Sequence, residues 1–303
     1  MTSLERTALM GTSHKDGVVD IVLSVVIVSY KNYGVLSNCL DSIQKFNDIG
    51  DALEVIVVEQ TPESDLYARL CREYPWVVAV RRENKGFGAG NNAGAAIAHG
   101  RYLLFLNPDT VLLEPVFRFS IARFEENPKL GLFGVRLVDS SGNRNQSFYF
   151  RKPYGILRGS ILWRICDRFD LFIPNAMYIT GADMFVRANA FQQIGFFDER
   201  MFMYFEETYL CEKLEHAGMS IGYFSDRRIV HLEGKTGGNV AKFCRQLDSL
   251  EVLCGDLGYD FSRVMRKMAL DRKIKAMLGS DKETRRREVV EIERRLSMGR
   301  EGK

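Results

Sequence analysis

The sequence has few cysteines, and none of them falls in a recognisable pairing pattern. The six are scattered, without a single C-x-x-C pair: Cys39, Cys71, Cys166, Cys211, Cys244 and Cys254. A disulfide framework needs many cysteines in a short secreted chain, and a zinc module needs closely spaced pairs, so both classes are excluded. We therefore expect a protein of a reducing compartment, the cytoplasm.

Long apolar runs are also missing. No run reaches the roughly 20 residues that a membrane span requires. Residues 1–20 are polar and of mixed charge, so we interpret them as a flexible leader and not as a signal peptide. With 27% charged residues, 46% hydrophobic residues and only 7 Pro, the 303-residue chain is not collagen-like, of low complexity or largely disordered.

Positive charge is unevenly distributed. The formal net charge is +3, yet residues 263–303 hold 14 Lys and Arg against 7 Asp and Glu. Such a basic segment could contact an anionic membrane, or it could be a solvated helix or an oligomer contact. No nucleic-acid-binding motif accompanies it, so we expect no nucleic-acid partner. The oligomeric state stays open.

Short apolar runs alternate with amphipathic stretches in the first half of the chain. Strands are expected at 22–28, 54–58, 77–80 and 102–106, with helices around 35–46, 64–73, 88–99 and 115–126. This alternation predicts an α/β fold with a mostly parallel central sheet covered by helices on both faces. Ligands of such sheets bind at the carboxyl ends of the strands.

The second half is less regular. Residues 142–175 mix aromatics and arginines without a clear period, which suits either a membrane interface and polyprenyl-linked acceptor or a core-packing helix with solvated arginines. Further on we expect strands at 184–187, 221–224 and 228–231, and a helix at 206–216. Helical spacing then runs from residue 240 onward. These patterns divide the chain into an α/β domain at 21–238 and a basic helical extension at 239–303.

One carboxylate, Asp109, follows the apolar strand 102–106 within the run Asn107-Pro108-Asp109. A carboxylate delivered to the ligand-bearing edge can hold a divalent cation that also binds a diphosphate. The alternative is that Asp109 caps the helix expected near Pro115 or forms an Asx turn.

A glycine-rich run, Asn84-Lys-Gly86-Phe-Gly88-Ala-Gly90-Asn91-Asn92, also follows a strand and opens a helix. It could bind an anion at the helix N-terminus, or simply form a tight turn and cap. It is not a dinucleotide fingerprint, because it comes after the third strand and the turn after the first has no glycine. An NAD-type oxidoreductase is thereby rejected.

Two further elements are ambiguous when taken singly. Glu206 and Glu207 begin a helix, where acids complement the helix dipole, but either could also be a general base. His231 ends a short strand and is either a structural histidine or a ligand.

Together, and in this order, these segments resemble glycosyltransferase family 2, and within it the rhamnosyltransferase-like branch that builds bacterial cell-surface polysaccharides such as O-antigen. The resemblance extends from Ser24 to about Gly238. Its motifs lie at 24–30, 84–92, 106–109, 181–187 and 195–207, and at His231.

The resemblance implies a GT-A fold with a nucleotide-binding half at 21–110 and an acceptor-binding half at 111–238. It implies an inverting, metal-dependent transfer of a sugar, with rhamnose favoured, from a dTDP- or UDP-sugar to a saccharide or polyprenyl-linked acceptor. The metal is Mg²⁺ or Mn²⁺, and the enzyme is cytoplasmic or peripheral at the inner face of the membrane.

The resemblance also assigns roles to residues. Glu207 matches the catalytic base, and Asp109 and His231 match the residues near the metal. The donor side comprises Ser29, Tyr30, Glu59, Asn84, Gly86, Gly88, Asn91 and Asn107. The acceptor side comprises Asp183, Glu206 and Tyr209.

Four positions depart from the family pattern. Asn107 replaces the first acid of the metal-binding D-x-D motif, and Glu59-Gln60 replaces the usual acidic pair after the second strand. Glu207 replaces the usual Asp, and Tyr209 replaces an acid. These departures keep a second hypothesis open, a degenerate member that binds a sugar nucleotide or glycan without catalysis.

Overall fold

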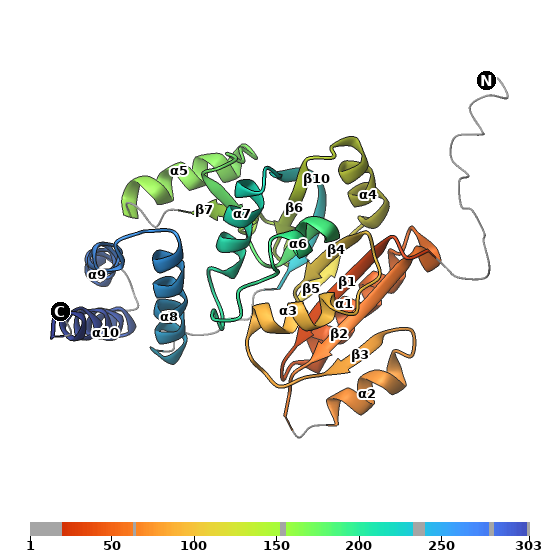
Figure 1. Cartoon of the computed structure of the whole chain (residues 1–303), viewed down its shortest axis with the longest axis horizontal. Coiled ribbons are helices and arrows are strands. Elements are labelled where there is room, and N and C mark those ends of the chain that lie inside the picture. The colour runs from red at the N-terminus through yellow and green to blue at the C-terminus, as the bar shows by residue number, and fades with distance from the viewer. Residues whose placement is uncertain (1–19, 63–64, 152–155, 233–239, 279–281, 302–303) are drawn as a thin grey trace.

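The structure is a computed structural model that describes residues 20–62, 65–151, 156–232, 240–278 and 282–301. The leader expected at 1–20 lies almost wholly outside the described residues. The centre of the molecule is an eight-stranded sheet (Figure 1). From edge to edge its strands are β3 (Val78–Arg81), β2 (Leu53–Glu59), β1 (Leu23–Ser29), β4 (Tyr102–Leu106), β9 (Asp183–Arg187), β6 (Leu130–Val138), β10 (Ser220–His231) and β5 (Thr110–Leu112).

The sheet is mostly parallel, as predicted. Strands β3, β2, β1 and β4 run parallel, and β10 runs parallel to β6. Strand β9 is antiparallel to both β4 and β6, and β5 is antiparallel to β10. Because Leu23 is in register with both Leu53 and Tyr102, strands β1, β2 and β4 run side by side, and their carboxyl ends lie on the same side of the sheet.

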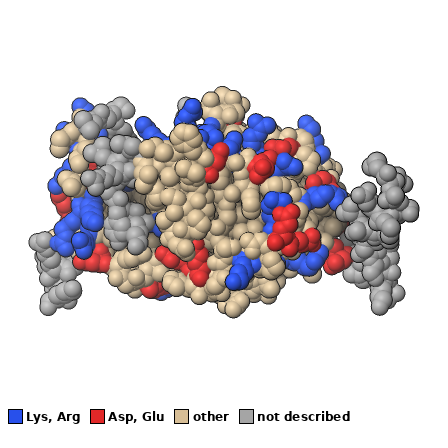
Figure 2. Space-filling view, turned by 90° about the horizontal axis from the view of Figure 1, so that it is seen from above, with Lys and Arg blue, Asp and Glu red and all other residues tan. Residues whose placement is uncertain are grey.

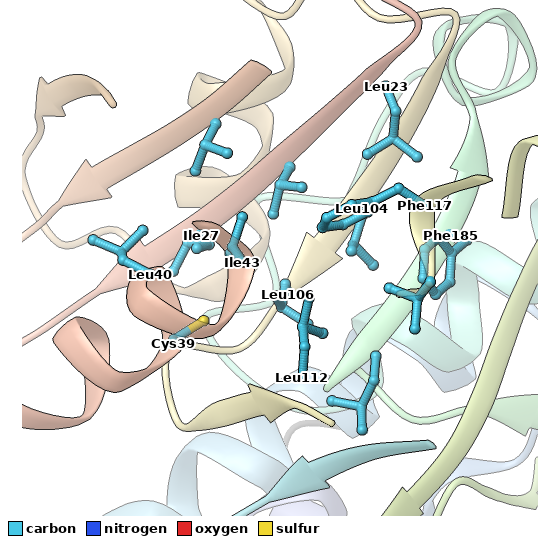
Figure 3. Packing of buried hydrophobic residues seen from close by; sticks show 14 of the residues in the cluster. Leu23, Ile27, Cys39, Leu40, Ile43, Leu104, Leu106, Leu112, Phe117 and Phe185 are labelled. Atoms are coloured by element: carbon cyan, nitrogen blue, oxygen red, sulfur yellow. The ribbon is translucent and has the colours of Figure 1, made fainter. Parts of the chain in front are cut away.

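Helices cover both faces. One face is packed by α1 (Tyr33–Lys45), α2 (Leu66–Glu73) and α4 (Phe117–Glu126), and part of its core is drawn in Figure 3. The other face is packed by α3 (Phe87–Ala95), α6 (Ala188–Gln193) and α7 (Glu206–His216). Strand β1 serves both cores, with Val25 and Ile27 in the first and Val26 in the second, as expected of a central strand that is apolar on both sides.

The irregular stretch at 142–175 contains defined elements. Strands β7 (Phe148–Phe150) and β8 (Met177–Ile179) form a separate antiparallel pair, and α5 (Ile156–Arg168) packs against β7. The two strands expected at 221–224 and 228–231 are one strand, β10, with an irregularity between Phe224 and Arg228. A short 3-10 turn, Gly50–Ala52, precedes β2.

The C-terminal extension is helical, as predicted. Its helices are α8 (Val240–Asp256), α9 (Phe261–Leu278) and α10 (Lys282–Glu301). They share a third core, which also includes Met201 and packs against Phe205 and Tyr209. The hydroxyl of Ser249 donates to the backbone carbonyl of Met203, 2.9 Å away. The extension therefore docks on the segment that leads into α7. In the described part of the chain, no helix combines the length and the apolar character needed to cross a membrane.

Candidate active site

Asp109 and His231 lie side by side although they are far apart in sequence. Strand β5 pairs with β10 so that Thr110 faces His231, and the N–H of Leu232 donates to the carbonyl of Asp109 at 2.9 Å. This register leaves 3.4 Å between His231 Nε2 and Asp109 Oδ1, with the two side chains 16% and 22% exposed. Helix α4 begins at Phe117 without a side-chain cap, so Asp109 does not cap it.

These two side chains suit a divalent cation that a substrate helps to hold. The described residues contain no group of three or more His, Cys, Asp and Glu placed to bind a metal. Mg²⁺ and similar ions are commonly bound by one or two protein ligands together with substrate phosphates. A carboxylate and an imidazole within reach of solvent fit that pattern, with the remaining ligands supplied by a diphosphate.

Asn107 and Asp183 meet behind this pair. The N–H of Asn107 donates to the carbonyl of Ala182 at 3.0 Å, and the Asn107 carbonyl accepts from Thr110 Oγ1 at 2.7 Å. Asp183 is fully buried, and its Oδ2 accepts from the N–H of Val135 at 2.7 Å. Burial raises the pKa of this carboxyl well above its ordinary value. Asp183 is thus a buried residue of the sheet whose carboxyl bonds to β6, and the turn that carries Asn107 is held by the carbonyl of Ala182.

A hollow of about 540 Å³ opens beside the ends of β1, β2 and β3. Tyr30, 43% exposed, stands at its wall, and the hydroxyl of Ser29 nearby is buried without a hydrogen-bond partner among the described residues. The size and position suit a nucleoside. The lining residues are Tyr30, Gln60, Thr61, Pro62, Arg81, Arg82, Glu83 and Asn84.

Glu59 shapes this hollow from below. It is buried, its Oε1 accepts from the N–H of Thr61 at 2.7 Å, and Thr61 Oγ1 accepts from the N–H of Lys31 at 2.7 Å. The carboxylate therefore orders the turn after β2, and the hydroxyl of Thr61 ties that turn to the one after β1. Thr61 and Arg81 line the hollow but were not predicted, since nothing in their local sequence marks them.

The glycine-rich run supports a close approach of two segments. Gly86 has φ +107°, and a Cβ built there would lie 2.2 Å from the carbonyl oxygen of Phe202. That same carbonyl accepts from the N–H of Phe87 at 2.9 Å, and Asn84 Oδ1 accepts from the N–H of Gly86 at 3.1 Å. The segment before α7 thus rests directly on the glycine turn.

Gly88 and Asn91 have similar packing roles. A Cβ at Gly88 would lie 3.0 Å from Phe197 Cβ. The buried amide of Asn91 donates to the carbonyl of Phe87 within α3. The turn is therefore present, whereas α3 begins at Phe87 without a side-chain cap.

Glu206 and Glu207 begin α7 directly after Tyr204 and Phe205, which both have positive φ. Glu206 is buried, and its Oε2 has no partner in the described structure. Burial raises the pKa of Glu207 to about 7 and that of Glu206 well above its ordinary value, with the neighbouring acid adding to the second shift. Glu207 can therefore exchange a proton near neutral pH, which a general base requires.

Tyr178 is a neighbour of Glu207 that was not predicted. It lies on β8, where burial and then the charge of Glu207 raise its pKa, and it hydrogen-bonds to Thr208. The stretch before β8 has no clear period, so the sequence gives no signal for this contact.

Tyr209 is turned away from this group. Its hydroxyl donates to Asp256 Oδ2 at 2.8 Å, and Arg200 donates to both Asp198 and Asp256. Burial and then Asp256 raise the pKa of Tyr209 to about 12. Of the three residues expected on the acceptor side, only Glu206 lies next to Glu207.

Comparison with known proteins agrees with this arrangement. Residues 24–195 match the sequence model described as "Glycosyl transferase family 2". The chain is 23% identical over 222 residues to rhamnosyltransferase WbbL of Escherichia coli K12, covering 68% of this chain and 82% of WbbL. It is 36% identical over 125 residues to N-acetylglucosaminyl-diphospho-decaprenol L-rhamnosyltransferase of Mycobacterium tuberculosis, covering 37% of this chain and 40% of that enzyme.

Among solved structures, the chain resembles the mannosyltransferase PcManGT of Pyrobaculum calidifontis, solved with GDP-Man and Mn²⁺. The TM-score is 0.57 at 13% identity, covering 85% of this chain and 76% of PcManGT. GalNAc-T7, solved with UDP, GalNAc and Mn²⁺, gives a TM-score of 0.57 at 15% identity, covering 77% of this chain and 48% of its own. These likenesses confirm the GT-A fold.

Proposed function

This chain belongs to glycosyltransferase family 2, and from that premise we propose that it is an inverting, metal-dependent transferase with Glu207 as its base. The observation that carries the proposal is the environment of Glu207. Burial raises its pKa to about 7, and it begins the helix whose leading segment rests on the glycine turn. A carboxyl poised near neutral pH can accept a proton and release it again within each turnover.

In this mechanism Glu207 acts on the acceptor. Its ionised carboxylate accepts the proton of the acceptor hydroxyl while that oxygen forms a bond to the anomeric carbon of the donor sugar. The bond from that carbon to the nucleoside diphosphate breaks, and its electron pair leaves with the diphosphate. Attack opposite to the leaving group inverts the anomeric carbon. Such base catalysis typically contributes about 10²- to 10⁴-fold.

Asp109 and His231 would hold Mg²⁺ or Mn²⁺ together with the donor diphosphate. When bound, the cation neutralises the negative charge that grows on the leaving phosphate. The 3.4 Å separation of the two side chains supports this role. A ring nitrogen of His231 and a carboxylate oxygen of Asp109 would be the two protein ligands.

For the donor we propose a dTDP- or UDP-sugar, with rhamnose favoured because WbbL and the mycobacterial relative are named as rhamnosyltransferases. The hollow between Tyr30 and Arg81 would take the nucleoside. Of the donor-side residues predicted from the family pattern, Tyr30 and Asn84 line this hollow, and Glu59 lies in the turn beside it.

For the acceptor we propose a saccharide on a polyprenyl diphosphate, used at the cytoplasmic face of the membrane in cell-surface polysaccharide assembly. The name of the mycobacterial relative, which specifies a decaprenol-linked acceptor, supports this class. The acceptor would approach Glu207 from the side of β7 and β8.

The second candidate is a member that binds a sugar nucleotide without transferring it. The orientation of Tyr209 toward Asp256 favours it, because the acid expected two positions after the base is absent from the site.

One experiment separates the two candidates. Transfer from dTDP-rhamnose to a polyprenyl-diphosphate-linked N-acetylglucosamine is measured with Mg²⁺, with Mn²⁺ and after chelation, and donor binding is measured in parallel by thermal shift. We expect metal-dependent transfer by the wild type, and donor binding without transfer by Glu207→Gln. Metal-dependent donor binding without transfer to any acceptor would favour the non-catalytic candidate. Full activity of Glu207→Gln would overturn the assignment of the base.

A further inference from the structure

An apolar surface extends over the outer side of α5 and the loop that follows it. Leu162, Ile165 and Phe169 are 47%, 48% and 66% exposed, and Leu171 and Ile173 are exposed beside them in sequence. We call these five residues the α5 patch. Single exposed apolar residues are common on protein surfaces, but a contiguous group indicates a binding surface.

The α5 patch is not the side by which α5 packs on the rest of the protein. Residues 162, 165 and 169 recur at helical spacing and form one stripe along α5. The opposite side of the helix is packed, because Cys166 is buried and Trp163 Nε1 donates to the carbonyl of Phe148 at 2.8 Å. The helix is therefore held by its inner side while its outer side stays apolar.

The exposed charges on the described part of α5 have one sign. Arg164 and Arg168 are exposed on the same helix. The acids nearby are withdrawn: Asp170 is bound by Arg136 and Arg144, and Asp167 is sufficiently buried that its pKa is raised. Figure 2 views the molecule from the side on which α5 lies in Figure 1, and uncharged residues occupy the middle of that face, with both basic and acidic residues around them.

We propose that the α5 patch docks the protein on an anionic phospholipid bilayer. Apolar side chains that enter the interface beside arginines whose long side chains reach the phosphates are the pattern of helices lying in a membrane surface. A second copy of the chain fits less well. A two-fold contact centred on α5 would bring Arg164 and Arg168 of one copy close to the same arginines of the other, which like charges oppose.

The place of the patch relative to the site supports this occupant. Trp163 packs on Tyr149 of β7 with 5.7 Å between ring centroids, and β7 pairs with β8, which carries Tyr178 next to Glu207. Docking through α5 would thus hold the acceptor side of the site near the bilayer. This part of the inference rests on the proposed lipid-linked acceptor, whereas the docking itself does not.

The basic C-terminal helices are the competing surface. They too expose apolar side chains, including Leu270, Met277 and Val290. Many of their cations, however, are already paired with acids of the same helices. The pairs are Arg272 with Glu288, Lys273 with Glu293, Lys275 with Asp271, Arg287 with Glu283, and Arg294 and Arg295 with Glu291. Their positive charge is less available to lipid than that of Arg164 and Arg168.

Flotation of the full chain with vesicles tests the proposal. Vesicles of phosphatidylcholine alone are compared with vesicles containing about one third phosphatidylglycerol, and we expect binding only to the second kind. The triple variant Leu162→Ser, Ile165→Ser, Phe169→Ser should bind about tenfold more weakly or worse, because three large apolar side chains no longer enter the interface. The double variant Arg164→Gln, Arg168→Gln should bind anionic vesicles about fivefold more weakly for each arginine removed. Its binding should also depend much less on the salt concentration.

The matched control carries Leu270→Ser, Met277→Ser and Val290→Ser, which remove as many exposed apolar residues from α9 and α10. We expect it to bind like the wild type. Far-ultraviolet circular dichroism and thermal shift with nucleotide sugar verify that each variant is folded. The single variant Phe169→Ser, at the most exposed position of the patch, replaces the triple variant if that one does not fold.

Three results would overturn the proposal. In the first, the wild-type chain does not bind anionic vesicles. In the second, a patch variant binds them as well as the wild type. In the third, a patch variant changes from oligomer to monomer while its vesicle binding is unchanged. The last would assign the patch to a second copy. Flotation needs no turnover, so failure of the proposed transferase activity and failure of docking are seen separately.

Discussion

Tyr209 donates its hydroxyl hydrogen to Asp256, with 2.8 Å between the oxygens, and this bond joins the helix of Glu207 to the first helix of the C-terminal extension. Arg200 donates to the same carboxylate and to Asp198. The residue at which the family pattern expects an acid is thus bonded to a carboxylate of α8, away from the group around Glu207. The extension thereby becomes part of the framework that positions α7.

Replacing Tyr209 with Phe should destabilise the protein modestly. The ring keeps its packing and one hydrogen bond to a partly exposed carboxylate is lost, so we expect a decrease of about 1 kcal/mol in the free energy of unfolding. Tyr209→Asp should cost more, because it places a third carboxylate beside Asp198 and Asp256. Urea unfolding measures both changes. The control is Tyr30→Phe, which should change the free energy of unfolding by about 0.5 kcal/mol or less. An unchanged stability in Tyr209→Asp would show that α7 and α8 are not coupled through this cluster.

The pH dependence of transfer should report Glu207. Its pKa is raised to about 7, and a general base must be ionised, so kcat/KM should fall as the pH decreases through about 7. Below that value the decline should approach tenfold per pH unit. Rates at saturating metal and donor between pH 5.5 and 8.5 measure the profile. Glu207→Gln should lower kcat/KM by about 10²- to 10⁴-fold. Its kcat/KM should also no longer decline as the pH falls below about 7. An inflection near pH 4.5 would mean that the working carboxyl is solvated, contrary to the structure.

A substitution at Gly86 should separate steric conflict from backbone strain. Gly86→Ala must adopt φ +107° with its Cβ 2.2 Å from the Phe202 carbonyl oxygen, so the segment before α7 has to move. Gly142→Ala is the matched control, since Gly142 has φ +80° and nothing within 4 Å of the added carbon. The control should cost about 1 kcal/mol.

Gly86→Ala should lower the free energy of unfolding, measured in urea, clearly more than Gly142→Ala does. It should also slow sugar transfer, because Glu207 directly follows the displaced segment. Equal costs for the two variants would mean that residues 201–205 are not held against the glycine turn.

Much of the sheet was predictable, and its omissions have a physical reason. The run at 102–106 was predicted to the residue, because a strand buried on both faces is a continuous apolar run. Strand β6 was not predicted, although most of it is buried, because Gly131 and Gly134 disfavour a strand. Both glycines are required by packing, since a Cβ there would lie 2.7 Å from Met219 Cβ and 2.5 Å from Ile179 Cγ2.

The site shows a similar division. The residue types at Asp109, Glu207 and His231 could be read from the sequence. The proximity of Asp109 to His231, however, depends on the pairing of β5 with β10, and β5 has only three residues. No local pattern encodes such a contact. The orientation of Glu59 was also beyond prediction, because it is determined by a hydrogen bond from the N–H of Thr61.

Asp183 should make stability depend on pH in a direction opposite to that of a salt-bridged acid. Burial raises its pKa in the folded protein, so the folded state retains a proton that the unfolded state has released above about pH 4. Stability is therefore greatest below the unfolded pKa and falls as the pH rises toward the folded pKa, by up to about 1.4 kcal/mol per pH unit. The variant Asp183→Asn tests this. Its side chain keeps an oxygen that accepts the hydrogen bond from the N–H of Val135, but it cannot ionise. The variant should be close to the wild type at pH 4.5 and increasingly more stable than it toward pH 7.5, as measured by urea unfolding at several pH values. The difference between the two proteins isolates this carboxyl from Glu206 and Glu207, whose raised pKa values act in the same direction in both. A constant difference across this range would mean that Asp183 is ionised in the folded protein and that a cation or donor group reaches its second oxygen.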